Sequence, residues 1–377
     1  MINKKLKVGN VPNLRFPEFT EEWETKKLGE VATNVMYGMN AAATNYDGEN
    51  QYIRITDIDE QTRLFCPNPL SSPDGELDNK YLLHKGDILF ARTGASVGKS
   101  YLYNDKDGKI YFAGFLIRLN VRAEDPYFIF SQTLTEKYQR WVLTMSMRSG
   151  QPGINAEEYK LLPIVIPSIQ EQEKISSFLS LIDSRIQTQN KIIEQLETLI
   201  KGLCQKLILN QVPNKKINNC VSSYSSSLTE SDVIDKNGIY PVYGATGIIA
   251  FTENPQINED AILIIKDGSG VGKVQYASDK FSVIGTLNYL TVKPDVNLKY
   301  IFFCLKYFNF EKYKVGSGIP HIYFKDYGET FIYCPPLEEQ NKIESLLSSI
   351  DSKINIETQY IKELKEQKTF LFQQMFV

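Results

Sequence analysis

The sequence has few of the residues from which catalytic and metal sites are built. It contains two histidines, His84 and His321, and five cysteines, none in a C-x-x-C pair. An odd, scattered set of cysteines is typical of reduced thiols in the cytosol, and two histidines disfavour a histidine-based metal site. We therefore predict a cytoplasmic protein without a bound metal.

Long apolar runs and an excess of charge are also lacking. No run of 18 apolar residues occurs, so no transmembrane span is expected, and the first ten residues carry no secretory signal. Forty-two basic and 45 acidic residues give a net charge of −3. This balance argues against a protein that holds nucleic acid by global charge alone, and it does not exclude local basic surfaces. The length of 377 residues allows two or three domains.

Familiar catalytic motifs are missing too. The chain has no D-P-P-Y or N-P-P-Y segment for adenine methylation and no glycine-rich loop that opens a helix. The run from Gly94 to Ser100, G-A-S-V-G-K-S, has three residues before G-K where a phosphate loop needs four. Asp74, Asp78 and Lys80 resemble a nuclease site only superficially, because they crowd one turn. We predict that the chain is not an enzyme.

What the chain does contain is a repeat. When Pro167 is set on Pro335, 12 of the 20 positions that follow, including the proline, are identical at a constant offset of 168 residues. Apolar residues recur at steps of three and four in both copies, which predicts two long amphipathic helices of about 38 residues, or roughly 57 Å. So narrow a stripe favours a coiled coil between the copies; the alternative is two helices packed on separate cores.

The repeat extends into the sequence before each helix. Gly86–Lys99 matches Asp260–Lys273 at an offset of 174, and Ser149–Asn155 matches Ser317–Tyr323 at 168. Short apolar runs between turn signals predict strands, with one helix over Pro126–Met147 and another near Lys299–Tyr313. The fold class is therefore α/β (α+β), with two β-rich domains and an internal pseudo-twofold repeat. The expected parts are an N-terminal anchor with the first β-rich domain (1–168), a central long helix (169–210), the second β-rich domain (211–336) and a C-terminal long helix (337–377).

The glycine-rich turns are the best candidates for binding. They can present backbone N–H groups, a hydroxyl and a lysine to a phosphate backbone, or they are plain hairpins with exposed basic residues. Arginine and glutamine suit base edges. The candidate DNA-binding residues are Arg54, Arg92, Thr93, Ser96, Lys99, Arg148, Ser149 and Gln151 in the first half, and Tyr243, Lys266, Asp267, Ser269, Lys273, Ser317 and His321 in the second.

Three sets of motifs resemble one known family. They are P-x-L-R-F-P-x-F-x-x-x-W with L-G-E-V (Pro12–Trp23, Leu28–Val31), the paired P-x-x-x-E-Q-x-K-I helix entries, and the R-T-G-x-x-x-G-K turn. Together they resemble the specificity subunits of type I restriction–modification systems. The second half departs from the first where Lys266-Asp267 replaces Arg92-Thr93.

The resemblance implies two target-recognition domains separated by an antiparallel pair of long helices. Each domain would read one half of a bipartite double-stranded DNA target, and the helices would set the spacing. Two modification (methyltransferase) subunits would hold S-adenosylmethionine, and restriction (motor-nuclease) subunits would use ATP and Mg²⁺, so this chain itself needs no cofactor. A coiled-coil adaptor without DNA recognition is the alternative. The candidate partner-binding residues on the helices are Gln172, Lys174, Asp183, Gln340, Lys342 and Asp351.

Overall fold

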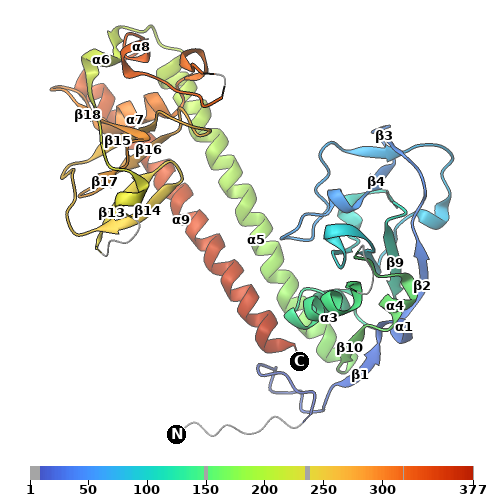
Figure 1. The fold of residues 1–377 in the computed structure, drawn as a ribbon. Helices are drawn as coiled ribbons and strands as arrows, with labels where there is room; N and C mark the ends of the chain where they lie inside the picture. The colour runs from blue at the N-terminus through green and yellow to red at the C-terminus, as the bar shows by residue number, and fades with distance from the viewer. Residues whose placement is uncertain (1–8, 148–151, 234–237, 317, 377) are drawn as a thin grey trace, which may run out of the picture. The chain divides into compact units, whose positions relative to one another are not determined.

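The computed structural model describes residues 9–147, 152–233, 238–316 and 318–376. The chain forms two compact units. The first comprises the chain up to Gln187 together with residues from Lys362 onward, and the second comprises Thr188–Ile361. Each unit therefore contains one β-rich domain and a part of each long helix. In Figure 1 the two parts of a unit can be found by the colour of their residue numbers.

The first domain is built on a four-stranded antiparallel sheet in the order β2-β9-β6-β7. Its central strands are buried on both faces, which explains their nearly unbroken apolar runs. The sheet strands are β2 (Ala32–Tyr37), β6 (Asp87–Ala91), β7 (Ser100–Leu102) and β9 (Leu116–Val121). Smaller pairs are β1 (Glu24–Lys27) with β10 (Pro163–Ile166), β3 (Ala43–Asn45) with β5 (Ser71–Pro73), and β4 (Gln51–Ile53) parallel to β8 (Ile110–Phe112).

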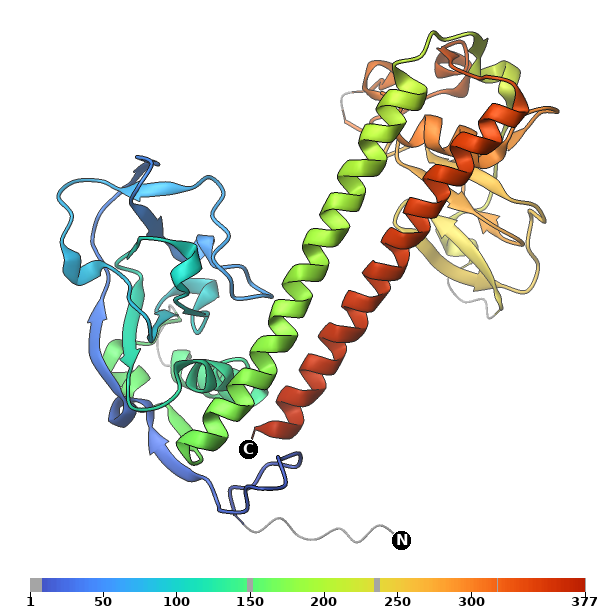
Figure 2. The ribbon, with the colours of Figure 1, turned by 180° about the vertical axis from the view of Figure 1, so that it is seen from behind.

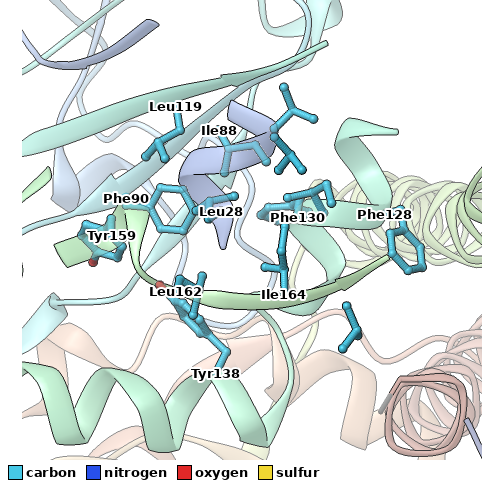
Figure 3. Packing of buried hydrophobic residues seen from close by; sticks show 14 of the residues in the cluster. Leu28, Ile88, Phe90, Leu119, Phe128, Phe130, Tyr138, Tyr159, Leu162 and Ile164 are labelled. Carbon is cyan, nitrogen blue, oxygen red and sulfur yellow. The ribbon is translucent and has the colours of Figure 1, made fainter. Parts of the chain in front are cut away.

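Short helices cover one face of this sheet. They are α1 (Leu28–Val31), α2 (Pro126–Gln132), α3 (Glu136–Ser146) and α4 (Ala156–Lys160). Elsewhere in the domain, 3-10 turns lie at Ile55–Asp57, Asn79–Tyr81, Gly94–Ser96 and Asp105–Asp107. Figure 3 shows the core between the sheet and these helices. There Phe90 of β6 lies beside Tyr159 of α4, with ring centroids 4.8 Å apart. Burial of such large apolar side chains is the main force that holds the domain together.

The second domain repeats this topology. Its sheet has the order β12-β18-β15-β16, which corresponds strand for strand to β2-β9-β6-β7. The sheet strands are β12 (Val221–Ser225), β15 (Ala261–Ile265), β16 (Val274–Ala277) and β18 (Leu287–Val292), and the remaining strands are β11 (Lys215–Lys216), β13 (Tyr240–Gly244), β14 (Gly247–Thr252), β17 (Ser282–Val283) and β19 (Phe331–Ile332). Its helices are α6 (Ile217–Cys220), α7 (Leu298–Lys306) and α8 (Phe324–Tyr327), with 3-10 turns at Glu230–Asp232 and Glu311–Tyr313. The mixed fold class and the internal repeat are confirmed.

Two predicted helices are interrupted. The helix predicted over Pro126–Met147 is broken into α2 and α3, because the Thr133 hydroxyl donates to the Phe130 carbonyl and Thr135 caps α3 by accepting from the Tyr138 amide. The helix predicted near Lys299–Tyr313 ends at Lys306, and a separate 3-10 turn follows. Threonine hydroxyls that bond to nearby backbone thus break the first helix without glycine or proline.

The long helices are α5 (Ile169–Cys204), which continues as a π-helical turn at Gln205–Leu209, and α9 (Leu337–Met375). Within the first unit, the start of α5 packs with the end of α9, and Asp183 pairs with Lys368. Within the second unit, the end of α5 packs with the start of α9, so the helices run antiparallel in each (Figure 2).

The two expectations for the helices are both met in part. Ile175 and Leu179 of α5 share the first domain's core with Phe372 and Met375 of α9, so the helices pair and also complete a domain core. No helix in the described part of the chain is long and apolar enough to cross a membrane.

Candidate nucleic-acid interface

The two glycine-rich turns have the same backbone hydrogen bonds. In both domains, the first and third residues after the strand form backbone hydrogen bonds with the later S-G-x-P-x-I segment. The first domain has Gly94 N to Pro152 O (3.1 Å) and Ile154 N to Arg92 O (2.9 Å), and the second has Gly268 N to Pro320 O (3.0 Å) and Ile322 N to Lys266 O (3.0 Å). Two motifs that the sequence marked separately are thus joined in each domain.

The last glycine of each turn is required by its backbone. Gly98 has φ +85°, and a Cβ there would lie 2.6 Å from a methyl group of Val142. Gly272 has φ +86°, and a Cβ there would lie 2.8 Å from Phe310 Cβ. Each turn leads from one strand into the next, β6 into β7 and β15 into β16, so neither is a phosphate loop opening a helix.

Lys99 and Lys273, at equivalent positions, have opposite environments. Lys99 is buried, its Nζ donates to the Ile58 carbonyl at 3.1 Å, and it lies 2.6 Å from a Glu60 carboxylate oxygen. The prediction that Lys99 faces DNA is therefore wrong, because its ammonium group is buried within the domain. Lys273 is exposed and lines a groove of about 580 Å³ with Ser269.

The second residue after β6 and the second residue after β15 also differ between the domains. Thr93 makes a backbone bridge with Gly153, and Asp267 makes the equivalent bridge with His321. Only the second pair adds a side-chain contact, Asp267 Oδ1 to His321 Nδ1 at 2.6 Å, and both side chains are about one-third exposed. Ser96, near the first turn, is half-buried. The equivalent backbones thus present different chemistry.

Arg92 is held by two aromatic rings that sequence reasoning missed. Its guanidinium carbon lies 5.0 Å from the Tyr37 ring centroid and 5.9 Å from that of Phe115. Both rings are exposed, at 40% and 61%. A cation over aromatic faces is stabilised by the ring quadrupole. Lys266, at the equivalent place, is half-buried.

Two other candidate DNA-binding residues contact side chains of their own domains. Arg54 grips the buried Asp57 carboxylate with two bonds of 2.8 Å, and these hydrogen bonds raise the pKa of the guanidinium. Tyr243 is half-buried against Phe281, with centroids 5.7 Å apart, and burial raises the pKa of its hydroxyl. The remaining candidates, Arg148, Ser149, Gln151 and Ser317, lie outside the described residues.

The glutamines shared by the long helices are structural. Gln172 is fully buried, accepts from the Asp125 amide at 3.0 Å and donates to the Pro167 carbonyl at 2.9 Å. Gln340 does the same with the Asn297 amide (2.9 Å) and the Pro335 carbonyl (2.7 Å). Asp125 and Asn297 cap α2 and α7, so each glutamine fastens its helix to its own domain. The prediction that Gln172 and Gln340 bind a partner is wrong, because neither is accessible.

The other four helix candidates keep some exposure but have partners within the chain. Lys174 pairs with Glu18 and Asp183 with Lys368, both in the first unit. In the second unit, Lys306 pairs with Asp351 at 2.9 Å and Lys342 with Glu338 at 2.7 Å. Their role in partner binding stays a prediction.

The N-terminal segment of the first domain is anchored to α5. Arg15 forms two bonds of 2.7 Å with Glu171, and Trp23 Nε1 donates to the same carboxylate at 3.3 Å. This explains the arginine and tryptophan of the first motif. Glu339, at the equivalent place on α9, instead accepts from the Tyr333 hydroxyl at 2.8 Å.

Ligands for a metal ion do not converge among the residues that the structure describes. No group of three or more His, Cys, Asp or Glu side chains lies close enough to hold one. The buried cysteines Cys204, Cys220, Cys304 and Cys334 all lie in the second unit's core. They act there as small apolar side chains.

Comparison with known proteins gives a consistent result. The family model "Type I restriction modification DNA specificity domain" matches residues 20–198 and 216–366. The chain is 25% identical to the putative type I restriction enzyme MjaX specificity subunit of Methanocaldococcus jannaschii, covering 97% of this chain and 93% of that protein. It is 23% identical to the MjaVIII specificity subunit of the same organism, covering 94% and 91%.

The fold is similar to that of a solved structure. The type I restriction–modification S subunit from M. genitalium matches with a TM-score of 0.71 at 18% identity, covering 97% of this chain and 99% of that one. At that identity the match supports the architecture.

Proposed function

The chain belongs to the type I restriction–modification DNA specificity family, and we propose that its two β-rich domains each read one half of a bipartite DNA target. It is a DNA-recognition specificity subunit. The observation that carries the proposal is the shared turn, in which equivalent backbone bonds present Arg92 and Thr93 in one domain and Lys266 and Asp267 in the other. Two domains that share a backbone arrangement but carry different side chains would recognise two different half-sites.

We place the domain limits at residues 1–168 and 211–336, with the long helices at 169–210 and 337–377. In this proposal Arg92, Thr93 and Ser96 of the first domain face DNA, as do Lys266, Asp267, Ser269, Lys273 and His321 of the second. On the basis of the sequence alone, we also propose DNA contacts for Arg148, Ser149, Gln151 and Ser317. Phosphate contacts position a protein on DNA, and base contacts specify the site.

The chemistry is proposed to lie in partner subunits. Two modification subunits would bind the long helices and hold S-adenosylmethionine, and restriction subunits would use ATP and Mg²⁺. Exposed apolar side chains on the long helices of each unit support such docking: Leu181 is 69% exposed in the first unit, and Ile356 (63%) and Leu346 (46%) are exposed in the second. Lys174, Asp183, Lys342 and Asp351 would contribute polar contacts.

The experiment is selection from a library of random DNA duplexes by this chain together with a co-purified modification subunit. The bound fraction should contain two short motifs separated by an unread spacer of fixed length. If no sequence is enriched while the modification subunit still binds, the chain is a coiled-coil adaptor. Methyl transfer by the chain alone would contradict the assignment of catalysis to partners.

A further inference from the structure

We propose that Arg92 reads a G·C base pair in the first half-site, with Tyr37 and Phe115 fixing the plane of its guanidinium. This inference rests on the proposed DNA-reading function and names one base and one residue within it. It also implies that the second domain reads its half-site with a different set of side chains.

The three side chains come together because three strand ends meet. β2 ends at Tyr37, β6 ends at Ala91 just before Arg92, and β9 begins just after Phe115. β9 lies between β2 and β6 and runs antiparallel to both, so its start adjoins their ends. The backbone supports this arrangement, because the Arg92 amide donates to the Phe115 carbonyl at 3.1 Å.

The two rings of Tyr37 and Phe115, called the aromatic clamp below, leave the terminal amino groups of the Arg92 guanidinium available. In the described parts of the chain, no hydrogen bond or ion pair engages this group, and Nε is buried without a partner. Arg54, Arg15 and Arg118 differ, since each has a carboxylate close to its guanidinium. Aromatic rings cover the faces of a planar cation but do not satisfy its N–H groups. The terminal amino groups of Arg92 are therefore the part left to bind a ligand.

Guanine fits this edge better than a phosphate does. In the major groove, guanine offers two adjacent acceptors, O6 and N7, which match the paired donors of arginine. The arginine fork can also pair with a phosphate, but the two acceptors of guanine lie in the plane of one base, so a fixed guanidinium plane favours guanine. Tyr37 and Phe115, both exposed, would supply the fixed plane.

The second domain lacks this clamp although its backbone is the same. The strand register places Ser225, Lys266 and Thr286 where the first domain has Tyr37, Arg92 and Phe115. The Lys266 amide donates to the Thr286 carbonyl at 3.0 Å, as Arg92 does to Phe115. Ser225 and Thr286 offer no aromatic ring to the Lys266 cation. Lys266→Ala is therefore a matched control for Arg92→Ala.

The test is selection from the random duplex library with the wild type, Arg92→Ala, Arg92→Lys, Phe115→Ala and Lys266→Ala, each with the modification subunit. In the wild type, one G·C pair of the first half-site should be preferred roughly 5- to 150-fold, the range for one bidentate contact. Arg92→Ala should abolish that preference and Arg92→Lys should weaken it. Lys266→Ala alters the second domain, so it should leave the G·C preference of the first half-site unchanged even where it alters the second half-site.

The outcomes separate this inference from the broader proposal. An Arg92→Ala variant that binds all sequences more weakly but keeps the wild-type motif would make Arg92 a phosphate contact and overturn the inference. Should Arg92→Ala not fold, the exposed Phe115 carries the test, and an unchanged motif in Phe115→Ala overturns it. A wild type that enriches no sequence refutes the proposed function itself.

Discussion

Arg15 and Glu171 lie 156 residues apart and form an ion pair with two hydrogen bonds of 2.7 Å, from Nε to Oε1 and from Nη2 to Oε2. Glu171 is 1% exposed and Arg15 10%. The pair anchors the N-terminal segment of the first domain to the start of α5. Removing one partner leaves a buried charge without compensation.

Arg15→Met should therefore destabilise the first unit by about 3 kcal/mol. Both tryptophans of the sequence, Trp23 and Trp141, lie in this unit, so urea unfolding followed by tryptophan fluorescence measures it. Lys174→Ala is the control, because its pair with Glu18 is about half exposed and should contribute less than about 1 kcal/mol. Equal losses in the two variants would contradict a special role for Arg15.

Gln172→Ala and Gln340→Ala should each loosen one unit only. Each substitution leaves a half-buried amide and a buried carbonyl without the glutamine that bonded them, at a cost of about 2 kcal/mol. Backbone hydrogen exchange should show loss of protection at the Asp125 amide in the first variant and at the Asn297 amide in the second. If each variant exposed both amides equally, the glutamines would not act as local fasteners.

Lys273 and Lys99 should differ in DNA binding. Lys273 is exposed beside its turn, so Lys273→Ala should lower the slope of log affinity against log salt by about one. Lys99→Met should leave that slope unchanged and lower the thermal stability of the first unit, because it removes the bond to the Ile58 carbonyl. A salt slope reduced by Lys99→Met alone would reverse this assignment.

The two domains should be exchangeable readers. Replacing residues 30–165 with the matching region of a relative should change one half of the selected DNA sequence and leave the other half and the spacer as they were. The reason is that each domain has its own sheet and core. Changes in both halves would show that the domains do not read independently.

The long helices and the repeat were predictable because they depend on local periodicity and on identity over many residues. The break between α2 and α3 was not, since threonine hydroxyls rather than glycine or proline make it. The identity of Gln172 and Gln340 was visible, but its cause was not, because the bonds reach residues more than 40 positions away.

The site was predictable only as a pair of turns. The sequence marks Arg92 and Lys99 equally, and the contacts that distinguish them come from distant strands. Tyr37 meets Arg92 through the sheet register, and Ile58 meets Lys99 from 41 residues earlier in the chain. Such pairings depend on tertiary structure, which a single sequence does not encode as a local pattern.

The most direct test of a bipartite reader with a helical spacer is to lengthen both helices at one point. Gln189 of α5 and Glu357 of α9 are hydrogen-bonded, so four residues inserted at each keep the two helices matched. Four residues add about 6 Å, close to two base pairs at about 3.4 Å each. Two residues inserted at each site, as a control, rotate the apolar stripe by about 200° and should abolish binding.

The measurement is the spacer length in the DNA selected by the four-residue variant with its modification subunit. The account predicts two unchanged half-sites separated by a spacer about two base pairs longer than that of the wild type. An unchanged spacer, or normal binding by the two-residue variant, would contradict it.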